Sequence, residues 1–150
     1  PEGDFPGGIL TGIMSDKHFE VIEHTADWSI RVKGHDLRQL FTHAAEGMSI
    51  LLVGELDALP QDVKKNLEFS AFDIESLLVE WLSELAYWAE MEQIVFGRFQ
   101  IVELTQRTLH AVVYGGRAEE LHKHIKAVTY HNLEVVENDD GWETTIVFDV

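Results

Sequence analysis

Two stretches of this chain place apolar residues at helical spacing, and they limit the fold more than any other feature. The stretch after Asp36 aligns one apolar face: Leu37, Leu40, Phe41, Ala44, Ala45, Met48, Leu51 and Leu52. The stretch after Asp73 aligns another: Ile74, Leu77, Leu78, Trp81, Leu85 and Trp88. Both aspartates suit the N-cap position, Gln39 has capping-box spacing from Asp36, and Gly54 is a suitable C-terminal stop. We predict helices over Asp36 to Val53 and Asp73 to Met91, each burying one face.

The segments around these helices alternate apolar and polar residues, as half-buried strands do. Strands are predicted at 18–23, 28–33, 65–72, 94–104, 108–114, 125–136 and 142–150. The pair Asp140-Gly141 predicts a hairpin between the last two strands. A short helical turn is expected at 118–124. Two helices among strands joined by hairpin-like turns predict an α+β fold, with a largely antiparallel or mixed sheet packed against the two main helices.

The length of 150 residues favours one domain, here expected to span residues 18–150. Residues 1–17 are rich in glycine and proline and are expected to be a flexible N-terminal extension or a cloning remnant before or around Met14. The chain has no cysteine, which excludes disulfides, thiolate zinc sites and thiol catalysis. No apolar run approaches the ~20 residues of a membrane helix, so no membrane span is expected.

Acidic residues outnumber basic ones 27 to 11, which gives a formal net charge of -16. Proteins bind phosphate backbones through Lys and Arg, which release counterions, so direct nucleic-acid binding is not expected. Cations and basic protein surfaces are the partners that this charge favours. Solubility is the alternative explanation of the acidity.

The motif search finds no phosphate-cradling glycine loop, nucleophile elbow or zinc-protease helix. Glu80 and Glu84 lie one helical turn apart and could form an acid–base pair, although a solvated helix face explains them as well. His122 and His124 are interpreted as solvated surface residues, and His43 as a residue at the edge of the apolar face.

The chain ends in a strand pattern that runs directly into Asp149 and Val150. If Asp27 approaches this end, its carboxylate, that of Asp149 and the α-carboxylate of Val150 would converge. Oxygen ligands of that charge suit Ca²⁺, Mg²⁺ or Mn²⁺ better than zinc. A capping role for Asp27 and a solvated terminus remain the alternative. His24 and His131 adjoin these segments and could support the ligands, or be ordinary hydrogen-bonding residues.

The same segments resemble the archease family. The resemblance covers residues 19–150 and is carried by these blocks: His24-Thr25-Ala26-Asp27, the helix from Leu37 to Ala45, Leu77 to Leu85, Ile125 to His131, and Phe148-Asp149-Val150. The blocks around Asp27 and Lys126 are the most specific. Trp28 is a minor departure, because the family would have an aliphatic residue there.

The resemblance implies a small cytoplasmic protein that is not an enzyme and has no cofactor chemistry of its own. Archeases assist the GTP-dependent RtcB-type RNA ligase of tRNA splicing and RNA repair: they promote guanylylation of the ligase and allow multiple turnover. The metal-binding positions of the family correspond to Asp27, Asp149 and the carboxylate of Val150, and its functional lysine corresponds to Lys126. That lysine could neutralise the carboxylates or contact a phosphate. The family fold is built on strand–helix–strand–strand units.

Two other functions remain open at this point. One is a metal-dependent phosphate hydrolase acting at the same carboxylates. The other is an interaction or chaperone-like module in which the metal is only structural.

Overall fold

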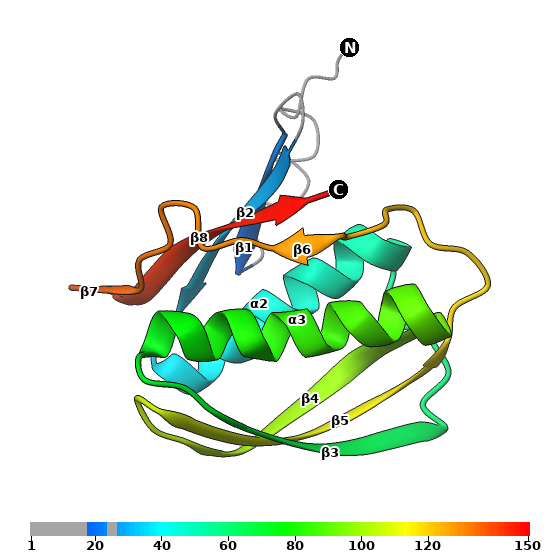
Figure 1. Ribbon diagram of the computed structural model, residues 1–150, viewed down its shortest axis with the longest axis horizontal. Coiled ribbons are helices and arrows are strands. Elements are labelled where there is room, and N and C mark those ends of the chain that lie inside the picture. Colours follow the sequence, from blue (N-terminus) through cyan, green and yellow to red (C-terminus); the bar gives the residue numbers. More distant parts are fainter. Residues whose placement is uncertain (1–17, 24–26) are drawn as a thin grey trace.

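The computed structural model describes residues 18–23 and 27–150 and contains two long helices between two antiparallel sheets (Figure 1). The helices are α2 (Leu37–Val53) and α3 (Ile74–Glu92). The strands are β1 (Phe19–Glu23), β2 (Asp27–Gly34), β3 (Val63–Ser70), β4 (Ile94–Leu104), β5 (Thr108–Arg117), β6 (Ala127–Val128), β7 (Val136–Asn138) and β8 (Gly141–Asp149). The predicted α+β class is confirmed. None of the helices described is long and apolar enough to cross a membrane.

The larger sheet has the order β1-β2-β8-β6, with β7 pairing to β8, and the smaller has the order β3-β5-β4. All of these pairings are antiparallel. Strand β3, helix α3 and strands β4 and β5 follow one another as a strand–helix–strand–strand unit. Both helices lie in a middle layer, so each can bury side chains against both sheets (Figure 1).

Each helix begins at its predicted cap. The Asp36 side chain accepts a 2.8 Å hydrogen bond from the Gln39 backbone N–H, and Asp73 accepts one of the same length from Ser76. The Gln39 side chain accepts from the His35 N–H, one residue before the cap, so the capping box is shifted by one position. Gly54 ends α2 with φ at +88°, a conformation that favours glycine.

The predicted apolar faces form the core. Leu40, Met48, Leu78 and Trp81 are fully buried, and Trp88 is partly buried against them. The Trp81 indole N–H donates a 3.0 Å hydrogen bond to the Phe41 carbonyl, which joins α3 to α2 while satisfying a buried donor.

Three sequence predictions are wrong in detail. Residues 118–124 form no helical turn, and the strand predicted over 125–136 is present only as the two-residue β6 and the first residue of β7, Val136. Between β6 and β7 the backbone turns at Asn132, whose φ of 52° is left-handed and cannot continue a strand. Strand β3 starts and ends two residues earlier than predicted, because Ser70 makes the last pair with β5 and Phe72 is exposed. The hairpin at Asp140-Gly141 is confirmed, with Asn138 paired to Gly141.

Candidate functional site at the end of the β2–β8 ladder

The end of β8 brings together residues that are far apart in the sequence. Asp149 pairs with Asp27 of β2 on one side and with Ala127 of β6 on the other. The backbone N–H of Lys126 donates a 2.7 Å hydrogen bond to the Asp149 carbonyl. Asp27, Lys126 and Asp149 therefore lie at one end of the larger sheet, where β8 ends between β2 and β6 (Figure 1).

The two aspartates point away from the helices. Phe148, the residue before Asp149, is fully buried and pairs with Trp28 and Val128, which belong to the core side of the sheet. Successive side chains of a strand alternate between faces, so Asp27 and Asp149 share the outer face. Asp149 and Lys126 are exposed, and Asp27 is half-buried.

Repulsion between the Asp27 and Asp149 carboxylates is unfavourable unless a positive charge lies near them. Like charges directly opposite each other in an antiparallel pair destabilise a sheet, because their side chains lie ~5 Å apart. A cation between the carboxylates would remove that repulsion. Lys126 immediately precedes Ala127, the β6 partner of Asp149, so it brings a basic residue to this end of the sheet. The arrangement is thus suited to holding a positive charge.

The donor set fits a hard divalent cation. Both side chains offer carboxylate oxygens, the ligands preferred by Ca²⁺, Mg²⁺ and Mn²⁺. Within residues 18–23 and 27–150, no group of three or more His, Asp or Glu side chains is arranged to hold a metal ion. A cation bound here would therefore need further oxygens, and the α-carboxylate of Val150, next in the chain to Asp149, could supply one.

The two histidines proposed to support the site are placed differently. His24 lies outside the described residues. His131 lies in the turn after β6, where its backbone N–H donates to the Thr129 hydroxyl at 3.2 Å and its ring Nε2 lies 3.3 Å from the Asn132 amide nitrogen. The contacts of His131 in this structure are with its own turn rather than with the paired aspartates.

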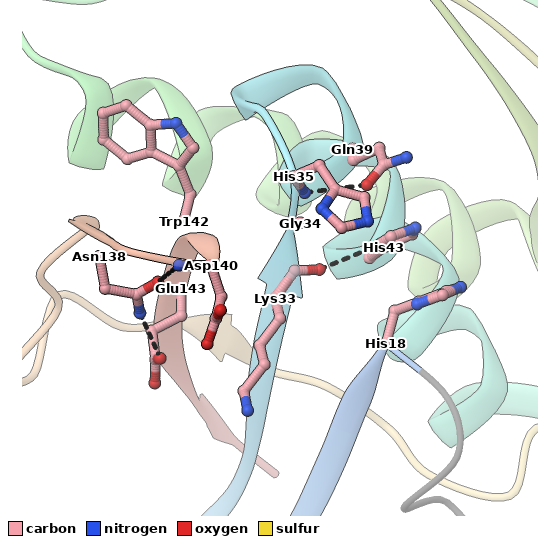
Figure 2. Close-up of a pocket in the computed structure, with 10 residues that line it drawn as sticks. All are labelled: His18, Lys33, Gly34, His35, Gln39, His43, Asn138, Asp140, Trp142 and Glu143. Carbon is pink, nitrogen blue, oxygen red and sulfur yellow. Dashed lines mark hydrogen bonds between the residues drawn. The ribbon is translucent and has the colours of Figure 1, made fainter.

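The opposite end of the same ladder holds a cavity of about 300 Å³ that the sequence did not predict. Figure 2 shows its walls: His18 just before β1, Lys33 of β2, His35 between β2 and α2, His43 of α2, and side chains of the β7–β8 hairpin. The rings of His18 and His43 stack with 3.9 Å between centroids and an angle of 11°. Sequence offered only one signal, His43 on the apolar side of α2, because His18 is brought to it by tertiary folding.

His43 is more buried than its predicted edge position, with 8% of its surface exposed. Its Nδ1 donates a 2.6 Å hydrogen bond to the Lys33 carbonyl, since a carbonyl can only accept (Figure 2). Burial lowers the pKa of His43 below its usual value, outweighing the opposite effect of this hydrogen bond. Burial also raises the pKa of Glu46, one turn further along α2.

The remaining candidates have ordinary surroundings. Glu84 accepts a 3.0 Å hydrogen bond from the Trp88 indole, and Glu80 is exposed, as on a solvated helix face. His122 and His124 are exposed, as predicted, and His124 lies 3.1 Å from a Glu90 oxygen.

Comparison with known proteins places the chain in a family. The model of the Archease protein family (MTH1598/TM1083) matches residues 19–150. The chain is similar to protein archease of Methanosarcina acetivorans, with 33% identity over 142 residues that cover 89% of this chain and 97% of that protein. It is also similar to protein archease of Methanopyrus kandleri, with 32% identity over 139 residues, 88% of this chain and 99% of that protein.

Two solved structures share the fold. The solution structure of Methanobacterium thermoautotrophicum protein 1598 has a TM-score of 0.72 and 26% identity, covering 89% of this chain and 99% of that one. The crystal structure of a Thermotoga maritima archease, described as a possible chaperone, has a TM-score of 0.63 and 22% identity, covering 86% and 94%. With its family match running from β1 through the paired aspartates to Val150, the chain belongs to the archease family.

Proposed function

We propose that this protein is a non-catalytic cofactor of a GTP-dependent RtcB-type RNA ligase, acting in the cytoplasm in tRNA splicing or RNA repair. The observation that supports the proposal is the pairing of Asp27 with Asp149 beside Lys126, in a chain of the archease family. The protein would promote guanylylation of the ligase and so allow it to turn over repeatedly.

In this proposal Asp27, Asp149 and the carboxylate of Val150 hold a divalent cation at the end of β8. When bound, the cation supplies positive charge for phosphate oxygens at the nucleotide site of the ligase. Lys126 stands at the same end of the sheet, where its ammonium group can neutralise the carboxylates or contact a phosphate. The chain positions charge and leaves the bond-making chemistry to the ligase.

The charge of the whole chain supports a protein partner rather than free RNA. With a net charge of -16, the surface repels a phosphate backbone and attracts a basic protein surface. Complementary charge raises the rate of association, and screening by salt lowers it. Docking to the ligase should therefore weaken as salt rises.

Guanylylation assays with a cognate ligase test the proposal. With limiting metal and GTP, wild-type protein should accelerate formation of the ligase–guanylate, whereas Asp27→Ala, Asp149→Ala and Lys126→Ala should remain folded and lose the stimulation. Asp57→Ala and Lys64→Ala are matched controls, because both residues are exposed and lie outside the end of β8. Equal turnover with and without wild-type protein would contradict the proposal, as would RNA cleavage or joining by this protein alone.

A further inference from the structure

A groove of about 510 Å³ lies between the C-terminal half of α3 and strand β6. Its walls are mostly apolar: Ala86, Tyr87 and Met91 come from the helix, and Ile125, Ala127 and Val128 from the strand side. Ile125, Val128 and Ala86 are buried core residues, so they form the floor of the groove, whereas Tyr87 and Met91 are open to solvent.

Helix α3 carries a second apolar row toward this groove. Tyr87 and Met91 are one turn apart and remain 56% and 62% exposed, although both are large and apolar. They lie outside the buried face that contains Leu78 and Trp81. A folded domain gains nothing from leaving such a pair in water beside an apolar floor, so the row is suited to a partner.

The groove adjoins the candidate site. Lys126 lines it, and the backbone of Lys126 is hydrogen-bonded to the Asp149 carbonyl. Strand β6 ends the order β1-β2-β8-β6 and, in the part of the chain that the structure describes, pairs only with β8. Its outer edge can therefore accept an extended segment from another protein, with that segment's side chains entering the groove.

Charge indicates what kind of segment would fit. Helix α3 contains glutamates at positions 75, 80, 84, 90 and 92 and no lysine or arginine. The groove is lined by one acidic residue, Glu90, which lies 3.1 Å from the exposed His124, and by one basic residue, Lys126. A segment that combines apolar side chains with flanking Lys or Arg would place the former against the apolar walls and the latter beside the glutamates of α3.

We propose that the groove between α3 and β6 docks an extended apolar segment of the RNA ligase that is flanked by basic residues. This inference rests on the proposed function, and it adds the surface that holds the two proteins together. The groove adjoins the strand that carries Asp149 through the Lys126 backbone, so a segment docked here would lie at the same end of the sheet as the end of β8. Affinity then comes from the groove, and stimulation from Asp27, Asp149 and Lys126.

Binding measurements with purified ligase test the groove against a matched exposed residue. Tyr87→Ser and Met91→Ser should each raise the Kd for the ligase about tenfold, which is the size of effect that large residues in an interface core produce. Phe72→Ser is the control: it also removes a large exposed hydrophobic, 78% exposed, but before α3 begins. Its Kd should stay within about twofold of wild type. Calcium affinity, measured separately, should be unchanged in all three variants.

A photo-crosslinking side chain at position 91 provides a second measurement. It should capture the ligase, and the same group at position 72 should not. If wild-type protein stimulates the ligase but the groove variants bind it as tightly as wild type, the groove is not the docking surface and the proposed function stands. If wild-type protein neither binds nor stimulates the ligase, both fail. Loss of self-association in the groove variants, with ligase binding unchanged, would assign the groove to a second copy and overturn the inference.

Discussion

The two ends of the β2–β8 ladder differ although one continuous register joins them. At one end Asp27 is opposite Asp149, and both are acidic. At the other end Lys33 is opposite Glu143 and Gly34 is opposite Trp142, next to the stacked rings of His18 and His43. The first end places like charges opposite each other, whereas the second places opposite charges opposite each other and has the buried His43 ring hydrogen-bonded to the Lys33 carbonyl.

The difference distinguishes the part of the ladder that stabilises the fold from the end that is suited to binding. The middle of the ladder, with Ile30 opposite Ile146, is fully buried and fixes the register for both ends. A cross-strand pair contributes only about 0.2–1 kcal/mol, so a core of this size can tolerate one repulsive pair. We therefore expect the opposed carboxylates to weaken the fold slightly, which fits a binding role, whereas the histidine end belongs to the packed structure.

The largest effect should come from the core that both ends share. Leu78 is fully buried, so Leu78→Ala should lower the free energy of unfolding by about 2–5 kcal/mol through lost burial and the cavity left behind. Urea denaturation of wild type and variant measures this. Metal binding and the histidine stack should be lost in the same transition. Separate transitions for the two ends would show that they do not share one core.

Sequence predicted the local features well and the long-range ones only in part. Asp36, Asp73 and Gly54 specify their helix ends through short-range hydrogen bonds and backbone preference, so both helices were predictable. Asp27 and Asp149 could be assigned to strand ends, but their register depends on the whole sheet and no spacing encodes it. The His18–His43 stack and the groove beside Lys126 arise from elements that meet only in the folded chain.

The next effect concerns the acidic end alone. Asp149→Ala should weaken Ca²⁺ or Mn²⁺ binding by at least about 10–100-fold, because loss of a residue that only orients a metal ligand already costs that much. Adding residues after Val150 should have a similar effect, because the α-carboxylate would become an amide. Calorimetric titration of each protein measures the affinity. Both variants should unfold within about 1 kcal/mol of wild type, since Asp149 is exposed.

Two results would contradict this expectation. Equal affinity in the extended chain would show that the α-carboxylate is not a ligand, and equal affinity in Asp149→Ala would move the site elsewhere. Glu143→Ala is the matched control, because Glu143 is an acidic residue at the opposite end of the same strand. It should leave metal affinity unchanged.

The histidine end should respond to pH instead. Because burial lowers the pKa of His43 below the unfolded value of 6.5, the fold favours the neutral imidazole. Its contribution to stability is present above pH 6.5 and is lost as pH falls through the lowered pKa. The slope from this one proton is at most about 1.4 kcal/mol per pH unit. His18, His35 and Asp36 also face the ring, and Asp36 opposes the decrease in its pKa.

The contribution of His43 can be isolated by comparing the pH dependence of stability in wild type with that in a variant without the imidazole. The raised pKa of Glu46 acts with the opposite sign: its ionised form is disfavoured in the fold, so stability from this group increases as pH falls toward 4.5. Urea denaturation of wild type and His43→Gln should therefore be compared at pH 7.5 and 5.5. Wild type should lose more stability than the variant on acidification. Parallel losses would show that His43 does not titrate in this range.

The smallest expected change in stability, that of Asp27→Asn, distinguishes the two ends of the ladder most directly. With a chelator present and at low salt, Asp27→Asn should raise the free energy of unfolding by about 0.2–1 kcal/mol, because it removes the repulsion from the directly opposed Asp149. The gain should shrink at 1 M salt, where charges are screened over about 3 Å. With saturating Ca²⁺, wild type should become more stable than Asp27→Asn, because only the protein that keeps both carboxylates is stabilised by binding the ion. Glu143→Gln, which removes a charge opposite Lys33, should show neither the gain nor the reversal. A metal-free Asp27→Asn protein that is less stable than wild type would mean that Asp27 supports the fold, and the contrast between the two ends would then be wrong.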